Sequence, residues 1–300
     1  MSDRRRAIIA FLVLTFVWGT TWAAIRFGLD GIPPLSGVAI RFLIAGAALL
    51  AVALLRGVRL GATTRERRLW VANALATFVI PYGVIYWAEI VVPTGLASIL
   101  FSTFPLWIVL LGRWVVPGDR VDRRRLLGVL AGFAGIAVIF SEDVAQLGGP
   151  GVRLRGAALL LAAVVSASGS LMVKRWGGGI SPLSLAAVPM LLCGVVTGLL
   201  AAAVERDAVW GLAPAPVLAT LYLALVGSAL TFTLYFWLLA RTTAVNVSMI
   251  SYTAPVVAVL IGTLVLDEPF TLRLALGGAL VLAGVAWALT ARREASRPAG

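Results

Sequence analysis

Apolar residues follow one another along this chain in long blocks, and most charged residues fall in the short segments between them. A block of roughly 20 residues is the length that an α-helix needs to cross a hydrocarbon core of about 30 Å. The pattern therefore predicts an all-α membrane protein. Its ten predicted transmembrane helices cover residues 7–27, 37–55, 69–88, 94–115, 126–140, 154–173, 183–204, 217–239, 245–266 and 272–291.

The start of the chain also suits a secretory signal peptide, because Arg4, Arg5 and Arg6 precede the first apolar block. A signal peptide would end in a small-x-small cleavage site after a shorter apolar run. The first block continues for about 20 residues with no such site before Gly28. We therefore expect an uncleaved first transmembrane helix.

Composition agrees with a membrane protein. Of the 300 residues, 61% are hydrophobic and 13% are charged, and the mean hydropathy is +1.00. Soluble domains have about a quarter of their residues charged. A chain of this length and composition suits one membrane domain in a lipid bilayer rather than two soluble domains.

The net charge of +12 raises the question of a nucleic-acid partner. Binding of nucleic acid needs a basic face, whereas the arginines here lie between apolar blocks, so we expect no nucleic-acid partner. Positive residues concentrate in the cytoplasmic loops of membrane proteins. A chain that starts in the cytoplasm and crosses ten times has most of its 25 Lys and Arg residues on the cytoplasmic side. We therefore expect a multi-pass protein of the bacterial inner membrane with both termini in the cytoplasm.

Residue types that support enzymatic chemistry are scarce. The chain has no histidine, a single cysteine at Cys193 and a single lysine at Lys174. These counts exclude an intrachain disulfide and an HExxH zinc motif, and no GxxxxGK[ST] phosphate-binding loop is present. We expect no catalytic residues, no metal and no cofactor.

A weak internal repeat relates the two halves of the chain at an offset of about 150 residues. In this register Pro105 aligns with Pro255, Trp87 with Trp237 and Thr20 with Ser170. Chance alignment of residues in apolar helices is the alternative. The repeat predicts two five-helix units, residues 1–148 and residues 149–300. Because five is odd, the second unit enters the membrane inverted, as in many secondary transporters.

Two features of the repeat suggest different roles. Pro105 and Pro255 remove a helical hydrogen bond at matching positions, and we interpret them as hinges or kinks. The fifth and tenth spans have closely spaced glycines and almost no polar side chains. Small residues let membrane helices approach closely, so these two spans are predicted to form a scaffold or the contact of a homodimer.

Polar and aromatic residues recur on the first, third, fourth, sixth, eighth and ninth spans, where burial in lipid is costly without partners. We interpret them as the lining of a substrate cavity. Serine and threonine often bond their own helix, and tryptophan and tyrosine often mark the membrane interface. The convergence of six spans favours the cavity. The candidate residues are Trp18, Thr21, Tyr82, Tyr86, Ser98, Phe101, Ser168, Met172, Phe232, Tyr235, Ser248, Ser251 and Tyr252.

Arg41 is the one clearly charged residue inside a predicted span, which makes it a candidate charge site. A structural role, by snorkelling or by pairing with Asp30 or Glu89, is the alternative. Glu89 lies at the end of the third span, where we expect a solvated rim position.

Three segments resemble the EamA-type drug/metabolite transporter superfamily: Trp18-Gly19-Thr20-Thr21-Trp22, Pro93-Thr94-Gly95-Leu96-Ala97 and Asp267-Glu268-Pro269. The resemblance is closest to aromatic and neutral amino-acid exporters. It implies secondary transport through a cavity lined by the same six spans. We therefore expect an alternating-access exporter of small neutral metabolites, such as aromatic or branched amino acids. Export of other drugs or metabolites, and a membrane-embedded enzyme or lipid-handling protein, are the alternatives.

Overall fold

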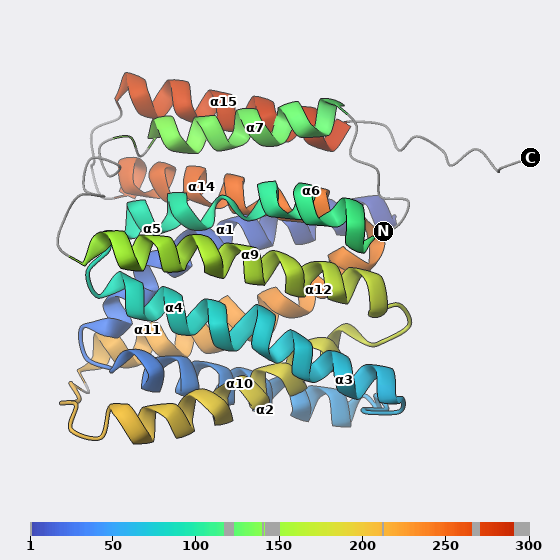
Figure 1. Ribbon diagram of the computed structural model, residues 1–300, viewed down its shortest axis with the longest axis vertical. Helices are drawn as coiled ribbons and strands as arrows, with labels where there is room; N and C mark the ends of the chain where they lie inside the picture. Colours follow the sequence, from blue (N-terminus) through green and yellow to red (C-terminus); the bar gives the residue numbers. More distant parts are fainter. Residues whose placement is uncertain are drawn as a thin grey trace, which may run out of the picture.

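The computed structural model describes residues 2–116, 123–139, 141, 151–211, 213–265 and 271–290, and within these residues the chain is helical without a strand. The helices run alongside one another through a single bundle (Figure 1). The first half contains α1 (Asp3–Leu29), α2 (Pro34–Leu55), α3 (Thr64–Asn73), the π-helix η1 (Ala74–Val79), α4 (Ile80–Glu89), α5 (Thr94–Phe101), α6 (Phe104–Val115) and α7 (Arg123–Ile139). The second half contains α9 (Val152–Trp176), α10 (Pro182–Val204), α11 (Pro214–Ala224), the π-helix η3 (Leu225–Leu230), α12 (Thr231–Arg241), α13 (Ala244–Ser248), α14 (Ile250–Val265) and α15 (Leu272–Thr290).

The helices follow the apolar blocks of the sequence. Among the described residues, eight helical segments are long and apolar enough to cross a membrane, and the apolar stretch Ala244–Val257 is shorter. The fifth predicted block corresponds to α7, which has 17 residues. The predicted ends at Phe140, Leu266 and Ala291 lie outside the described residues, and so does Asp267-Glu268-Pro269.

Prolines and a capping carboxylate mark the starts of several helices. Proline occupies the first turn of α2, α10 and α11, where its missing N–H has no helical partner to lose. The start of α2 is capped by a side chain from the other half of the chain. Glu205 accepts hydrogen bonds from the backbone N–H groups of Leu35 (2.7 Å) and Ser36 (2.9 Å). A carboxylate at a helix N-terminus satisfies free donors and complements the helix dipole.

Each half interrupts its third span with a π-helix, η1 in the first half and η3 in the second. The fourth span is also broken in each half, between α5 and α6 at Ser102 and Thr103, and between α13 and α14 at Met249. Single π-turns within α-helices widen the helix and often mark functional sites. The sequence repeat aligned Pro105 with Pro255, but it did not predict the π-helices or the breaks in the fourth spans.

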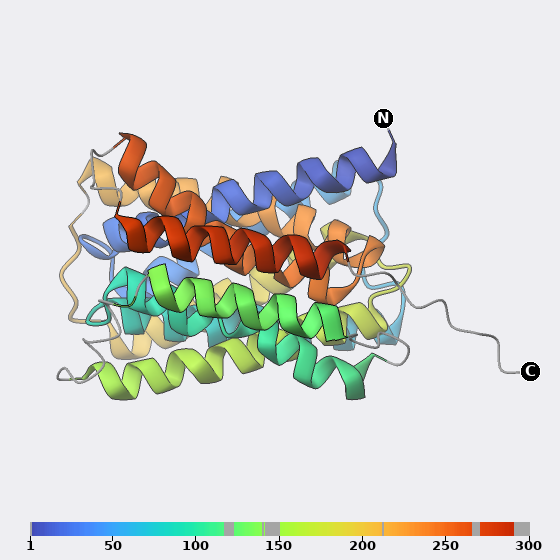
Figure 2. The ribbon, with the colours of Figure 1, turned by 90° about the horizontal axis from the view of Figure 1, so that it is seen from above.

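Two helix pairs flank the bundle. In Figure 1, α7 and α15 lie together at one edge and α2 and α10 lie together at the other, and Figure 2 shows α15 over the rest from above. Small residues permit the first contact, because a Cβ atom on Gly135 would lie 2.7 Å from the Gly277 carbonyl oxygen. A Cβ atom on Gly128 would lie 2.6 Å from the Gly284 carbonyl oxygen. The close approach predicted for the fifth and tenth spans is therefore present within one chain.

The helix directions define two ends of the bundle. In Figure 1, α1 begins and α15 finishes at the same end, whereas α1 and its repeat mate α9 run in opposite directions. The end at which α1 begins is here called the arginine-rich end, because Arg4, Arg5, Arg6, Arg56, Arg65, Arg67, Arg68, Lys174, Arg175 and Arg241 lie at helix ends there. The opposite end, where α4 finishes, is called the Glu89 end.

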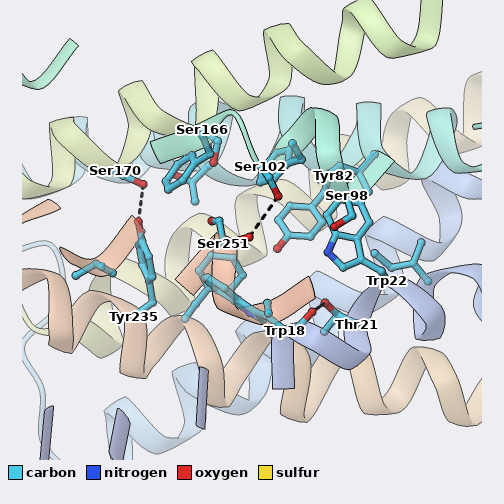
Figure 3. A pocket seen from close by; sticks show the side chains of 18 residues that line it. Trp18, Thr21, Trp22, Tyr82, Ser98, Ser102, Ser166, Ser170, Tyr235 and Ser251 are labelled. Carbon is cyan, nitrogen blue, oxygen red and sulfur yellow. Dashed lines mark hydrogen bonds between the residues drawn. The ribbon is translucent and has the colours of Figure 1, made fainter. Parts of the chain in front are cut away.

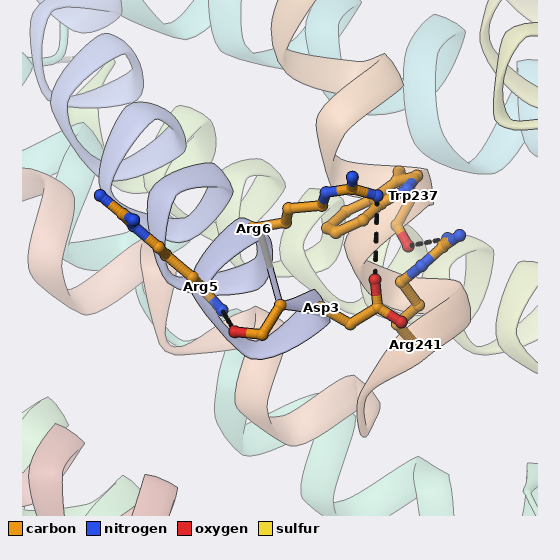
Figure 4. Close-up of polar contacts among 6 residues, drawn as sticks. Asp3, Arg5, Arg6, Trp237 and Arg241 are labelled. Atoms are coloured by element: carbon orange, nitrogen blue, oxygen red, sulfur yellow. Dashed lines mark hydrogen bonds and ion pairs between the residues drawn. The ribbon is translucent and has the colours of Figure 1, made fainter.

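Arginines at the arginine-rich end use nearby aromatic and acidic groups (Figure 4). Arg6 lies 3.9 Å from Asp3, and the guanidinium of Arg241 lies 4.2 Å from the ring centroid of Trp237. Contacts of this kind keep the cations at the surface while their stems cover apolar helix ends.

Candidate functional site

A cavity lies in the middle of the bundle, between the two flanking helix pairs (Figure 3). The space open to the centres of water-sized molecules is about 100 Å³. One water molecule needs roughly 10–15 Å³ by this measure, so the cavity has room for several waters or a small solute. Its walls come from both halves of the chain: α1, η1, α4, α5 and α6 from the first half, and α9, α12, α13 and α14 from the second. These elements belong to the same six spans that the sequence singled out.

Eight of the thirteen candidate residues line the cavity: Trp18, Thr21, Tyr82, Ser98, Phe101, Phe232, Tyr235 and Ser251. Aromatic rings form one wall. The indole of Trp18 lies 5.5 Å from the ring of Phe232 and 5.5 Å from the ring of Tyr235, measured between centroids. Rings at these separations stabilise one another, which holds the wall in place.

Hydroxyl groups are spread around the cavity on several helices, from Thr21 on α1 to Ser251 on α14. Tyr235 donates a hydrogen bond of 2.8 Å to Ser170, and Ser102 donates one of 3.3 Å to the carbonyl oxygen of Ser251. In Figure 3 the Ser102 bond joins the first half of the chain to α14 of the second half, whereas the Tyr235 bond joins α12 to α9 within the second half. None of the side chains that line the cavity, as far as the chain is described, is charged. The walls therefore suit a solute without net charge that has an apolar part and a polar part.

One donor in the cavity wall has no acceptor. The Nε1–H group of Trp18 is buried and makes no hydrogen bond to any described residue. Buried donors without partners are rare and destabilising in proteins. The Trp18 indole N–H is thus a donor that a bound solute can use.

The other five candidates lie outside the cavity lining. Ser168 and Ser248 donate to the carbonyl groups of Val164 (3.0 Å) and Val245 (2.7 Å) in their own helices, as serines in apolar helices often do. Met172 is half-buried on α9. The helical spacing of the sequence put these residues on polar faces, but the rotation of each helix against its neighbours decided which positions reach the cavity.

Tyr86 and Tyr252 have other neighbours. Tyr86 lies behind the wall, where its hydroxyl accepts a long hydrogen bond of 3.4 Å from Arg41. The ring of Tyr252 packs against α7, because a Cβ atom on Gly132 would lie 2.5 Å from it. A role of either tyrosine in transport stays a prediction.

The candidate set lacks four hydroxyl-bearing residues of the lining, namely Thr77, Ser102, Ser166 and Ser170. Thr77 belongs to η1, and a π-turn has no sequence signature that would have placed its side chain. A signal for Ser170 was available, because the repeat aligns it with Thr20, next to the candidate Thr21.

Arg41 is buried within the bundle, with 1% of its surface exposed. Its Nε donates to Ser228 (2.7 Å), and its Nη2 donates to the Gly227 carbonyl oxygen (3.3 Å). The guanidinium also lies 4.7 Å from the ring centroid of Tyr82, a cavity residue. No carboxylate lies within ion-pair distance of Arg41 among the described residues, so pairing with Asp30 or Glu89 is not its structural role. Arg41 instead joins α2 to η3 behind the cavity wall.

Glu89 differs from its predicted environment. The sequence suggested a solvated rim position, but only 1% of the residue is exposed and neither carboxylate oxygen has a hydrogen-bond partner in the described chain. After Glu89 the chain turns back, with the N–H groups of Val91 and Val92 bonded to the carbonyl of Ala88. The exposed positions therefore come after Glu89, beginning at Ile90.

The two paired prolines have different local settings. Pro105 is in the first turn of α6, just after the break in the fourth span, whereas Pro255 lies inside α14. The break at Ser102 and Thr103 lies directly before the first turn that contains Pro105. The break at Met249 lies further from Pro255 along the chain. The two prolines therefore align in the sequence repeat but occupy different positions in their helices. A hinge at either proline remains a prediction.

Comparison with known proteins decides the family. Two segments of the chain, residues 5–141 and 154–290, each match the EamA-like transporter family. The chain belongs to this family. It is therefore a membrane transporter rather than an enzyme.

Relatives agree with the assignment. This EamA-like transporter is 32% identical to the uncharacterized inner membrane transporter YedA of Escherichia coli (strain K12), over 85% of this chain and 81% of the relative. It is 32% identical to a probable terminal-alkyne amino-acid exporter of Streptantibioticus cattleyicolor, over 98% of each chain. A protein of known crystal structure shares the fold, with a TM-score of 0.78 at 24% identity over 94% of this chain and 96% of that one.

Proposed function

We propose that this transporter is a secondary exporter of small neutral metabolites, with aromatic or branched amino acids as the main substrates. The observation that supports the proposal is the uncharged cavity, which is lined by both aromatic rings and hydroxyl groups. An aromatic wall suits an apolar side chain, and hydroxyls suit the polar end of the same molecule. The similarity to a probable terminal-alkyne amino-acid exporter supports the same substrate class.

The proposed mechanism is alternating access. In this scheme the chain crosses the bacterial inner membrane ten times as two inverted five-helix units, residues 1–148 and 149–300. The units rock about the cavity, with Pro105 and Pro255 in the moving helices. The arginine-rich end faces the cytoplasm, because positive residues concentrate on that side, and both termini lie there.

Cysteine labelling tests the orientation. Cys193 is buried, and a Cys193→Ala background leaves single cysteines introduced as Ser2→Cys at the arginine-rich end or Asp207→Cys at the Glu89 end. An impermeant maleimide added to intact cells should label the second variant, and the first only after the membrane is opened. Labelling of both from the same side would contradict the orientation.

Solute exchange in proteoliposomes tests the substrate. The purified protein should exchange labelled phenylalanine or leucine, and Ser170→Ala should weaken the exchange because it removes a cavity hydroxyl. The matched control is Thr197→Val, which removes a buried hydroxyl bonded within α10 (2.7 Å to the Cys193 carbonyl oxygen). Exchange of a drug or another metabolite, with no amino acid accepted, would support the family but contradict the substrate class.

A further inference from the structure

Glu89 is a buried acidic residue whose carboxyl group has no part in the cavity lining. Glu89 is the last residue of α4. It is 1% exposed, and both Oε1 and Oε2 are without a hydrogen-bond partner among the described residues. Acidic residues inside membrane segments are rare and usually functional.

Charged groups surround Glu89 without pairing with it. From α1, Arg26 donates a hydrogen bond of 3.1 Å to the main-chain carbonyl oxygen of Glu89. From α2, Arg41 faces it through Tyr86. From α9, Arg155 lies 4.9 Å from the ring of Trp87. The remaining elements packed against α4, namely α5 and η1, have no charged or acidic residue.

This environment determines the form of the carboxyl group. An ionised carboxylate that is buried without a donor carries a large desolvation penalty, so the neutral acid is the form that fits the observed site. The guanidinium of Arg26 is already bound to the backbone of the same residue. A change of side-chain conformation, with a small movement of the helix ends, would therefore bring it to the carboxylate and form a charge-assisted pair.

The two residues also lie next to the cavity. Ile25 and Ile85 line it, Arg26 follows Ile25 directly, and Glu89 lies one helical turn beyond Ile85. Separation of α1 from α4 at this end would open the cavity and expose Glu89 to water in the same movement. Protonation of Glu89 and opening of the Glu89 end are thus linked.

We propose that Glu89 is a proton-binding site that controls the Glu89 end of the transport cavity. With the proton bound, the neutral carboxyl group stays buried, as it is in the structure, and this end stays closed. When the proton leaves to water at this end, the carboxylate pairs with Arg26 and the end opens. The inference rests on the proposed transport function, but the gate can be measured without a substrate.

A cysteine in the cavity wall reports opening of this end. In the Cys193→Ala background, Ile85→Cys is labelled in proteoliposomes by an impermeant maleimide at a series of pH values. The same cysteine together with Glu89→Gln gives the pH dependence of the reagent itself, because glutamine keeps the shape of the neutral acid and cannot ionise. Relative to that reference, labelling with Glu89 present should rise about tenfold from about pH 5 to about pH 8.

Two further variants make the result decisive. Arg26→Gln removes the partner of the carboxylate, so the rise in labelling should shift to higher pH or disappear. Asp207→Asn removes an exposed carboxylate at the same end and is the control. The rise in labelling with pH should be the same in the Ile85→Cys protein with and without Asp207→Asn. An identical pH dependence with and without Glu89→Gln would overturn the proposal. If Glu89→Gln does not fold, an Arg26→Gln profile equal to that of the unmodified site would overturn it instead.

Amino-acid exchange separates failure of the gate from failure of the substrate assignment. If labelling responds to Glu89 but no amino acid is exchanged, the proton site stands and the substrate class is wrong. If amino acids are exchanged and neither exchange nor labelling changes with Glu89→Gln, the substrate class stands and the proton site is wrong.

Discussion

The hydroxyl group of Ser102 lies 3.3 Å from the main-chain carbonyl oxygen of Ser251. In a regular α-helix the N–H group four residues later would bond this carbonyl, but that residue is Pro255, which has no N–H. The break in the fourth span of the first half thus supplies a donor to the helix that proline interrupts in the second half. The contact joins the two halves at the wall of the cavity.

Removal of this donor should weaken the contact between the halves. Ser102→Ala leaves the Ser251 carbonyl without its partner, and we expect a loss of about 1 kcal/mol in stability. Thermal unfolding in detergent measures the change, and Thr290→Ala, which removes a hydroxyl bonded within the exposed end of α15, is the control. Equal unfolding temperatures for the two variants would argue against a stabilising role of the Ser102 bond.

The unpaired indole N–H group of Trp18 should contribute to substrate binding. Trp18→Phe keeps an aromatic ring between Phe232 and Tyr235 but removes the donor. A neutral hydrogen bond contributes about 1 kcal/mol, so the concentration of substrate for half-maximal exchange should rise about fivefold. Trp176→Phe, at the exposed end of α9, should leave it unchanged. An unaltered value in Trp18→Phe would show that the substrate does not use this donor.

Arg41 should tolerate no replacement by lysine. A lysine has a single ammonium group and cannot reach Ser228 and the Gly227 carbonyl together, nor stack on Tyr82 as the planar guanidinium does. We expect Arg41→Lys to lose about 2 kcal/mol or more of stability, because buried polar groups are left without partners. Unfolding temperatures in detergent test this, with the exposed Arg206→Lys as the control. A variant as stable as the unmodified protein would show that the Arg41 contacts do not hold α2 to η3.

Adjacent glycines on α15 should respond differently to alanine. A Cβ atom on Gly277 would lie 2.6 Å from the side chain of Ile139 and 2.8 Å from the Gly135 carbonyl oxygen, whereas one on Gly278 meets nothing within 4 Å. Gly277→Ala should destabilise the protein by about 1–3 kcal/mol through overpacking. Gly278→Ala should be neutral or stabilising by up to about 1 kcal/mol, because alanine favours helix. If both variants unfold at the same temperature, the contact between α7 and α15 is not as tight as described.

Sequence reasoning succeeded where the signal was local. The apolar blocks predicted the long helices, since burial of a backbone in lipid requires a helix of sufficient length. The repeat around Pro105 and Pro255 predicted two related halves, and each half matches the EamA-like transporter family. Tyr86 and Tyr252 have the spacing of cavity residues, but in the structure they contact Arg41 and α7, and their role in transport stays a prediction. A helical period fixes which residues share a face, not which neighbour that face meets.

The sequence by itself determined that this protein lies in a membrane, that its two halves are related and that it belongs with the EamA-like transporters. Each of these follows from apolar length, charge placement and short motifs, which act locally along the chain. Only the tertiary structure decided that Arg41 bonds to Ser228 in the other half and that Glu89 is buried beside Arg26. Such environments depend on how distant helices rotate and pack together, because burial and hydrogen bonding are properties of the assembled neighbours rather than of any one segment.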